Sequence, residues 1–493
     1  MGALRFYAPP IERLSRRFDA AYVVDYDQVP RRSKVQHDGK ILSIDFEGDD
    51  SVKLRIPWNV DEFQSYFLAT CSLRPRTEPY HLALEVARGV LSRLKALIAV
   101  CDGADIEQTE AFYAALGEAI EAFTIAATSD HHSEASQIAS QECIGHTAEA
   151  FAQLTNVYRD AAIDFIQEHA PHRTFLYGVN IRNEHPSADA SALLRPAFNT
   201  AVVSPVWKDC EPNEGRFDFE KVREQIRWCR SQGMRVVGGP VANLDDLNVP
   251  DWLYLWDNDF NSLLGFQLQY VETATRNLHG MTDLWYCSSG VNTTRAFHLT
   301  EEQQLRLLVG SIETMRRNDP QTPVLVSFDH PWGDYLSHAH RDLAPIHFAE
   351  EIVRANLGVT GVGVELNFND CEGAIFPRDP FEVIRLLDQW GMLGLPLFVT
   401  LTFPSSRRFD KRAAHQISDH ESPTFPISRR RQRQFVESLV PLILSHPQTQ
   451  AIFWNQFTDA TAHVYPNAGL FDRRDRPKST LRSLREIRQH YLT

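Results

Sequence analysis

Two acidic residues stand near the ends of strongly apolar segments. Glu365 lies in "GVGVELNF" (361–368), and Asp329 ends "PVLVSFD" (323–329). A carboxylate removed from water needs a partner or takes a raised pKa, and a raised pKa suits a carboxyl group to proton transfer. We therefore treat both as candidate catalytic residues. The structural alternatives are that Glu365 pairs with an arginine or caps a loop, and that Asp329 belongs to a turn before His-Pro.

Neutral polar and aromatic residues accompany these acids. Asn367 follows Glu365 by two positions, so strand alternation puts both side chains on one side. The segment after the 323–329 strand, "HPWGDY", and the strand at 450–457 supply most of the others. Trp332 and Trp454 could equally be core residues, and Asp334 could merely cap its loop. The candidate substrate-binding residues are Asn292, in the loop after the strand at 283–289, together with His330, Trp332, Asp334, Asn367, Trp454 and Asn455.

Such residues act together only if the fold gathers the strand ends. From residue 174 onward, apolar segments alternate with amphipathic helical patterns such as "DFEKVREQIRWCRSQG". Eight strand-helix units predict a (β/α)8 barrel, which presents its chemistry at the carboxyl ends of the strands. An open doubly wound sheet is the alternative. The predicted strands are 174–181, 198–205, 234–241, 283–289, 323–329, 361–368, 396–403 and 450–457.

Two further regions precede the barrel. Residues 1–75 hold short alternating segments, including "KILSIDF" and "SVKLRIPW", which predict a small β-sandwich-like domain. Residues 76–173 carry apolar positions at helical spacing and predict a helical region. The division of the chain is then 1–75, 76–173 and 174–493. The first region could be an accessory sugar-binding module or could simply pack on the barrel.

The third region resembles glycoside hydrolase family 10, the xylanase family. "VVSPVWKDCEPNEGRFDFEKV" is similar to that family's "W…EP..G.F.F" segment, and "GLFD" with the following "PKST" resembles its final turn and helix start. "GVGVELNF" is similar to its "GIGxQxH" strand. The resemblance covers 174–493 and implies a barrel that binds β-linked carbohydrate. It also implies sugar contacts for Trp207 and Trp454 and for the positions of Glu365 and Asn367.

The same resemblance breaks at the two catalytic positions. Family members cut glycosidic bonds with two carboxylates, one after the fourth strand and one after the seventh. Here Gly290 and Leu401 stand in those places, and no acid occurs between Asp283 and Glu301. Ordinary xylanase chemistry is therefore not expected. Two functions stay open: a glycoside hydrolase whose carboxylates have moved to Glu365 and Asp329, or a carbohydrate-binding or structural protein that has lost the chemistry.

Composition and sequence patterns disfavour nucleic acid, membrane and metal as partners of this chain. The chain has 493 residues and a net charge of −14, which disfavours nucleic acid, because phosphate binding depends on Lys and Arg. No apolar run resembles a signal peptide or a membrane span, so a cytoplasmic location is the expectation. The seven cysteines form no CxxC pair, and the histidines of 338–347 lack a metal-binding motif. We expect no metal and no cofactor, and the oligomeric state stays open.

An open pocket at the strand ends, with Glu365 and a second acid within reach, would favour the enzyme. A pocket filled by Leu401, Phe403 and the loop at 404–427 would favour the inactive form.

Overall fold

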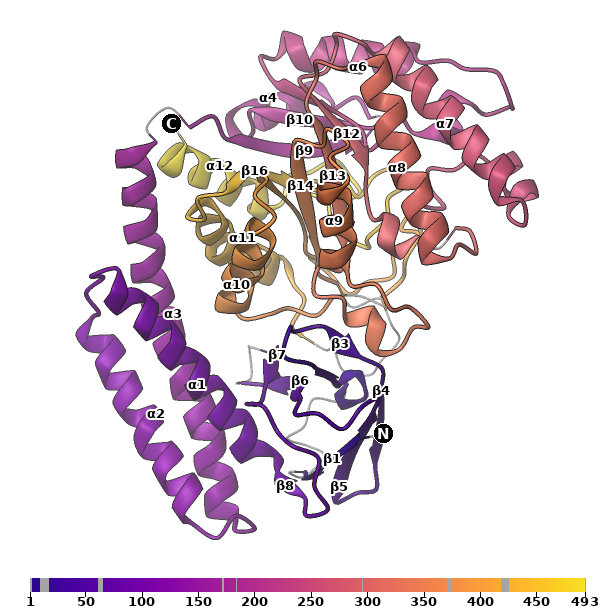
Figure 1. Cartoon of the computed structure of the whole chain (residues 1–493). Coiled ribbons are helices and arrows are strands. Elements are labelled where there is room, and N and C mark those ends of the chain that lie inside the picture. The colour runs from indigo at the N-terminus through magenta and orange to yellow at the C-terminus, as the bar shows by residue number, and fades with distance from the viewer. Residues whose placement is uncertain are drawn as a thin grey trace.

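Eight parallel strands close into a barrel in the computed structural model (Figure 1), which describes residues 2–8, 17–60, 65–170, 173–182, 184–294, 296–369, 375–417 and 425–492. Pairing of the last strand with the first, Ala451 to Leu176, completes the ring and excludes the open sheet. The predicted barrel is confirmed. Its strands are β9 (Leu176–Arg182), β10 (Thr200–Val203), β11 (Arg235–Gly238), β12 (Leu284–Ser288), β13 (Val324–Asp329), β14 (Gly361–Asn367), β15 (Leu397–Thr402) and β16 (Thr449–Trp454).

Helices cover the outside of the barrel. In α6 (Glu220–Ser231), Val222, Ile226 and Cys229 recur at helical spacing and are buried, while charged residues face outward. Asp379 caps α10 (Pro380–Gly391), and Pro380 opens it at a position where a missing N–H is harmless. The other helices of this region are α4 (Ala188–Ala197), α5 (Trp207–Cys210), α7 (Phe260–Asn277), α8 (Glu301–Asn318), α9 (Pro345–Arg354), α11 (Arg429–Leu444) and α12 (Ser479–Tyr491).

The amino-terminal region contains two four-stranded sheets, in the orders β4-β5-β1-β8 and β3-β2-β6-β7. Alternating residues such as Leu42, Ile44 and Ile56 are buried in a core shared by the two sheets. The β-rich start of the chain is thus as predicted. Its strands are β1 (Gly2–Tyr7), β2 (Tyr22–Val24), β3 (Pro30–Arg31), β4 (Ser33–His37), β5 (Ile41–Phe46), β6 (Lys53–Asn59), β7 (Ser65–Ala69) and β8 (Tyr80–His81).

Three helices follow, namely α1 (Leu82–Gly103), α2 (Glu110–Thr128) and α3 (Glu134–His169). They lie side by side, and the last of them runs back toward the barrel (Figure 1). Val86 and Val90 of α1 enter the core of the sheets, so the first two regions share packing. The boundaries at 75 and 173 stay predictions. Among the described residues, no helix is long and apolar enough to span a membrane.

Buried ion pairs join the amino-terminal region to the barrel. Glu382 of α10 accepts hydrogen bonds from Arg55 of β6, at 3.0 Å, and from Arg93 of α1, at 2.8 Å. Burial alone raises the pKa of a carboxyl group, but the nearby charges of Arg55 and Arg93 hold the pKa of Glu382 well below its ordinary value. Ion pairs of Glu382 with Arg55 and Arg93 are therefore buried in the contact between the barrel and the part of the chain that precedes it.

Candidate active site

A pocket opens at the carboxyl ends of the barrel strands, where this fold places its chemistry. Its cavity volume is about 180 Å³. Asp329 and Glu365 both line it, and so do His330, Asn367 and Asn455. Much of the remaining lining consists of neutral amides and hydroxyls, namely Asn180, Ser204, Asn243, Asn248, Ser289, Thr293, Thr294, Asn369, Gln456, Thr458 and Thr461.

Glu365 lies at the floor of the pocket and is only 4% exposed. One carboxylate oxygen, Oε1, accepts hydrogen bonds from Ser289 Oγ at 2.7 Å, from Tyr286 Oη at 3.2 Å and from Ser327 Oγ. Burial, followed by repulsion from Asp329, raises the pKa of Glu365 above its ordinary value. The hydrogen bonds from the hydroxyl groups offset only part of this rise in pKa. The carboxyl group of Glu365 is therefore suited to hold and release a proton.

Asp329 stands next to Glu365 because β13 and β14 pair in register at these two residues. Asn367 Nδ2 lies 3.2 Å from Asp329 Oδ1 and 3.2 Å from Glu365 Oε2, so these two oxygens are no further apart than twice that distance. Retaining glycosidases separate their carboxyl groups by about 5 to 5.5 Å and inverting ones by about 6.5 to 9.5 Å. The bound on these two oxygens includes the retaining separation and ends just short of the inverting range.

Asn367 is fixed by further side chains. Its Oδ1 accepts from Thr402 Oγ1 at 2.7 Å and from Asn455 Nδ2 at 3.1 Å. Asn455 in turn accepts from Asn180 Nδ2 at 3.3 Å. Because its amide oxygen receives two donors, the amide nitrogen of Asn367 must face the carboxylates. The network thus sets which end of Asn367 meets the acid pair.

His330 and Asn292 lie beside Asp329. The Nδ1 atom of His330 is buried and has no hydrogen-bond partner among the described residues, and the backbone has a positive φ of 50°. A side chain with φ in this range is uncommon outside glycine and asparagine. Asn292 is 2% exposed and brackets the Asp329 backbone, donating to its C=O at 2.7 Å and accepting from its N–H at 3.1 Å. Asn292 does not line the pocket, so it positions Asp329.

The structure does not bring the three tryptophans into the pocket. Trp207 is 1% exposed, donates to Glu211 Oε2 at 2.7 Å and stacks on Tyr270. Trp454 donates to the carbonyl of Ala468 at 3.1 Å and is packed in the barrel–helix layer. Strand alternation explains this, since Asn455, the next residue, is the one that lines the pocket.

Trp332 and Asp334 belong to the contact with the amino-terminal region. Trp332 lines a separate cavity together with Pro30, and its ring lies 5.3 Å from the guanidinium of Arg378. Asp334 forms an ion pair with Arg378 at 2.6 Å and accepts a hydrogen bond from Tyr22 Oη. Neither reaches the acid pair, so we do not include them in the site.

The structure shows what surrounds the two positions where the resembled family has glutamates. Leu401 is fully buried in the layer between barrel and helices, and Thr402 is the residue of β15 that meets Asn367. Gly290 lines the pocket with a φ of 58°, and a Cβ built on it would lie 3.6 Å from Asp329 Cβ. The side chain of Asp329 therefore begins next to the place that a residue at 290 would fill.

Three hydroxyl residues of the site were not anticipated from the sequence. Tyr286, Ser289 and Ser327 surround Glu365, yet Tyr286 and Ser327 occur inside apolar strands without any motif. One signal was available for Ser327, because it precedes Asp329 by two positions and alternation puts both on one side. The cross-strand neighbours of Glu365 could not be found from this rule alone.

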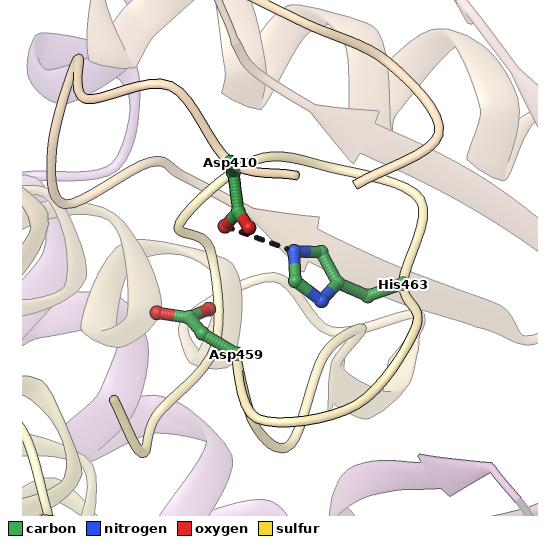
Figure 2. Close-up of side chains that lie close together, drawn as sticks. All are labelled: Asp410, Asp459 and His463. Atoms are coloured by element: carbon green, nitrogen blue, oxygen red, sulfur yellow. Dashed lines mark hydrogen bonds and ion pairs between the residues drawn. The ribbon is translucent and has the colours of Figure 1, made fainter. Parts of the chain in front are cut away.

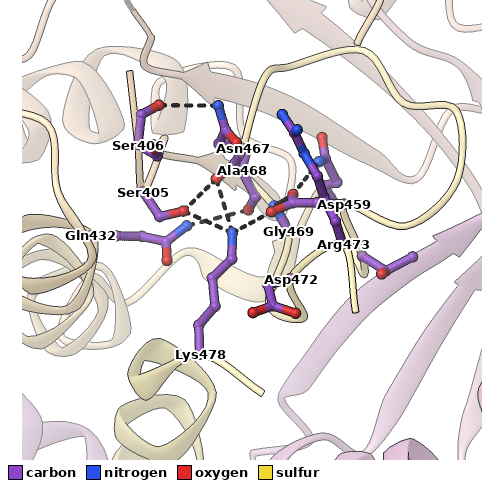
Figure 3. Close-up of polar contacts among 12 residues, drawn as sticks. Ser405, Ser406, Gln432, Asp459, Asn467, Ala468, Gly469, Asp472, Arg473 and Lys478 are labelled. Atoms are coloured by element: carbon purple, nitrogen blue, oxygen red, sulfur yellow. Dashed lines mark hydrogen bonds and ion pairs between the residues drawn. The ribbon is translucent and has the colours of Figure 1, made fainter. Parts of the chain in front are cut away.

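Asp410, Asp459 and His463 form a second buried group, with one ligand atom from each within 4.8 Å of the others (Figure 2), and of these His463 lines the pocket. His463 Nε2 lies 3.1 Å from Asp410 Oδ2. Lys478 Nζ lies 2.6 Å from Asp459 Oδ2 and also donates to Ser405 Oγ (Figure 3). Because an ammonium group already neutralises Asp459, we assign this group to the bracing of the loops after β15 and β16.

Searches of protein-family models and of curated proteins return no match. Solved structures similar to the chain include xylanase 10B from Thermotoga maritima, with 15% identity over 66% of this chain and 98% of that one and a TM-score of 0.48. A GH10 xylanase from Thermobacillus composti is 18% identical over 64% and 96%, with a TM-score of 0.46. At such identities and scores these matches carry no argument about function, and the barrel stands on its own strand pairing.

Proposed function

We propose that this protein binds a β-linked oligosaccharide in the barrel pocket and hydrolyses one of its glycosidic bonds with Glu365 and Asp329. One observation carries the proposal: two carboxylates at the mouth of a (β/α)8 barrel share the amide of Asn367. Two acids so close to each other cannot both be ionised at low cost, and this arrangement separates their protonation states.

The surroundings of each acid suggest its role. Glu365, with its raised pKa, keeps a proton and donates it to the oxygen of the leaving sugar. Asp329 is the nucleophile, and its carboxylate is held by hydrogen bonds from the His330 backbone at 2.8 Å and from Asn367. It attacks the anomeric carbon as the bond to the leaving oxygen breaks. Water then releases the sugar from Asp329, and Glu365 takes up the proton of that water.

The amides and hydroxyls of the pocket lining, which also includes Arg182, Glu184, Asp245 and Asp246, fit a neutral sugar. Amides and hydroxyls can donate to and accept from the many hydroxyl groups of such a ligand. Within the described residues, neither Leu401 nor Phe403 lines the pocket, and Phe403 stacks instead on Phe435 at 4.5 Å. The described part of the loop after β15 contributes His415 to the wall.

The test is turnover of β-1,4-linked xylo- and cello-oligosaccharides and of aryl β-glycosides, followed by chromatography. We expect Glu365→Gln and Asp329→Asn each to lower kcat by about a hundredfold or more, the usual scale for a general acid or base. Glu313→Gln, at an exposed position of α8, is the matched control and should leave the rate unchanged. A folded Glu365→Gln protein with full activity would remove this residue from the mechanism.

A non-catalytic sugar-binding protein is the second candidate, and the burial of Glu365 favours it. A carboxyl group that is 4% exposed, with hydroxyl groups around one of its oxygens, can also be a fixed part of the wall. This reading predicts that oligosaccharides bind by calorimetry without turnover. It also predicts that Asn455→Ala weakens binding while Glu365→Gln changes it little.

A further inference from the structure

Three segments near the barrel pocket are rich in basic residues, although the chain as a whole is acidic. They are 405–417, after β15, 428–434, at the start of α11, and 472–478, before α12. Each holds four basic residues, and together they hold three acids, whereas the whole chain has 50 basic and 64 acidic residues. The sequence 418–424 adds two acids, which do not reverse this balance. We call the surface formed by the three segments the basic patch.

Contacts between side chains and backbone bring the three segments together. Arg473 donates to the C=O of Phe409 at 2.6 Å, which joins the third segment to the first. Arg429, the first residue of α11, donates to Asp472 Oδ2 at 3.0 Å, which joins the second segment to the third. The basic residues are therefore neighbours in space as well as numerous in the sequence.

Part of this positive charge has no partner within the described residues. The side chains of Arg408, Lys411, Arg430 and Arg474 are exposed, and they form no ion pair or hydrogen bond with another described residue. All three segments contribute to this group of four. Exposed ammonium and guanidinium groups attract anions, and the planar guanidinium fits the oxygens of a carboxylate or a similar oxyanion.

The basic patch adjoins the wall of the pocket. His415, in the first segment, lines the pocket, and its N–H donates at 3.1 Å to the C=O of Val464, which lines it too. The N–H of His463, a third lining residue, donates at 3.1 Å to the C=O of Arg412. A polymer that leaves the pocket on this side therefore meets the basic patch.

The opposite side of the pocket has the opposite sign of charge. Asp245 and Asp246 line the pocket in the loop after β11, and β11 lies four strands from β15 in the ring of eight. An anionic polymer is repelled by these acids and attracted by the basic patch, so the two sides favour one direction of the chain.

One aromatic ring belongs to the basic patch. Phe409 is 71% exposed and follows Arg408 directly. The apolar face of a sugar ring can pack on such a side chain. This ring and the continuity with the pocket favour a polysaccharide over nucleic acid, the other polyanion that a basic surface attracts.

We propose that the polymer bound in the pocket is a β-linked polysaccharide that carries anionic groups, either carboxylates or sulfate esters, and that the basic patch holds these groups on the units outside the pocket. The inference rests on the proposed function, because it takes the pocket as the place of a neutral unit of the same polymer. Anchoring of the charged units then selects which glycosidic bond reaches Glu365 and Asp329.

Binding is tested by calorimetric titration of the full-length protein with two derivatives of one β-1,4-glucan, the anionic carboxymethyl cellulose and the neutral hydroxyethyl cellulose. We expect the anionic polymer to bind about tenfold more tightly at 0.01 M NaCl, at roughly twofold for each exposed ion pair formed. This preference should disappear toward 1 M NaCl, since the Debye length falls from about 30 Å to about 3 Å. Cellulose sulfate, titrated in the same way, distinguishes sulfate esters from carboxylates.

A triple variant locates the charge that matters. Arg408→Gln/Lys411→Gln/Arg474→Gln removes three exposed charges that have no partner, and it should reduce the preference for the anionic polymer by about fivefold to tenfold. If the triple variant does not fold, Lys411→Glu takes its place, because it reverses one exposed charge of the basic patch.

The matched control is Lys95→Gln/Arg235→Gln/Arg317→Gln, which changes the net charge equally at exposed positions outside the basic patch. It should leave the preference unchanged. Equal binding of the neutral and anionic polymers at low salt would overturn the proposal, as would a preference that survives in the variant or falls equally in the control. Single-stranded DNA that binds as tightly as the preferred polymer would overturn it too.

Binding and turnover are separate measurements, so the two proposals can fail separately. A preference that depends on the basic patch, without hydrolysis of any polymer, would remove the hydrolase activity and leave this inference standing. Hydrolysis of both cellulose derivatives without any preference in binding would do the reverse.

Discussion

Replacing Asn367 by Asp probes the acid pair without changing its shape. The new oxygen would stand where Nδ2 now lies, 3.2 Å from Asp329 and 3.2 Å from Glu365. At an effective dielectric constant of about 20, two unit charges at that distance repel by about 5 kcal/mol. Asn367 is 2% exposed, so water screens this little, and the variant can escape the repulsion only by binding a proton.

The cost of that proton sets the magnitude. The folded state raises the pKa of the new Asp above its unfolded value of about 3.9, so holding the proton costs about 1.4 kcal/mol for each pH unit above it. The loss of unfolding free energy is then about 4 kcal/mol at pH 7 and about 1.5 kcal/mol at pH 5. A raised pKa leaves stability intact below the unfolded pKa and removes it as pH rises.

The assay is thermal unfolding of variant and parent between pH 4.5 and 8. We expect the Tm difference to grow with pH and to reach about 4 °C at pH 7, because an unfolding entropy of about 2.1 cal/mol/K per residue makes 1 kcal/mol worth about 1 °C in a chain of 493 residues. Asn261→Asp, at an exposed position in the first turn of α7, is the matched control and should show no such trend. A Tm difference that does not depend on pH would refute the shared amide contact between the two acids.

Three further substitutions test how other buried side chains are placed. Glu382→Gln leaves Arg55 buried without a charged partner and should lower the unfolding free energy by about 3 to 5 kcal/mol in urea titrations, whereas a loss below about 1 kcal/mol would contradict the buried pair. Leu401→Glu puts a charge among the covering helices, so we expect unfolded or insoluble protein by circular dichroism, and a stable folded variant would show that this side chain faces the pocket. Lys478→Met leaves the buried Asp459 carboxylate without its cationic partner and should lower Tm at pH 7. An unchanged Tm would show that the ammonium group is not needed for stability.

Much of the barrel could be predicted from the sequence. Each strand is an apolar run followed by a helical pattern, and eight such units leave closure as the natural arrangement. The two acids that lie side by side in the pocket could also be picked out, because Glu365 and Asp329 stand near the ends of buried strands and Asn367 follows by alternation; their catalytic role stays a prediction. These inferences use only local spacing.

The predicted binding residues that lie outside the pocket were chosen on grounds other than strand alternation, or depend on contacts between distant parts of the chain. The tryptophan at 454 was assigned to the sugar through family resemblance, although alternation with Asn455 puts its ring on the helix side. Asp334 was assigned to the pocket, but its partner Tyr22 is 312 residues earlier, a contact that no single-sequence pattern reveals. The hydroxyls around Glu365 depend on the register between strands, which is equally invisible in the sequence.

The contacts of the amino-terminal sheets have a mechanical consequence for the acid pair. Tyr22 holds the loop after β13 through Asp334, and the N–H of Phe67 donates at 3.2 Å to Pro377 in the segment between β14 and α10. These are the connections that leave the strands bearing Asp329 and Glu365. Among the described residues, none from the two amino-terminal sheets lines the pocket, but these hydrogen bonds hold the segments that follow β13 and β14. We therefore expect the loss of these contacts, by truncation or by a substitution such as Tyr22→Phe, to alter the spacing between the carboxyl groups of Asp329 and Glu365.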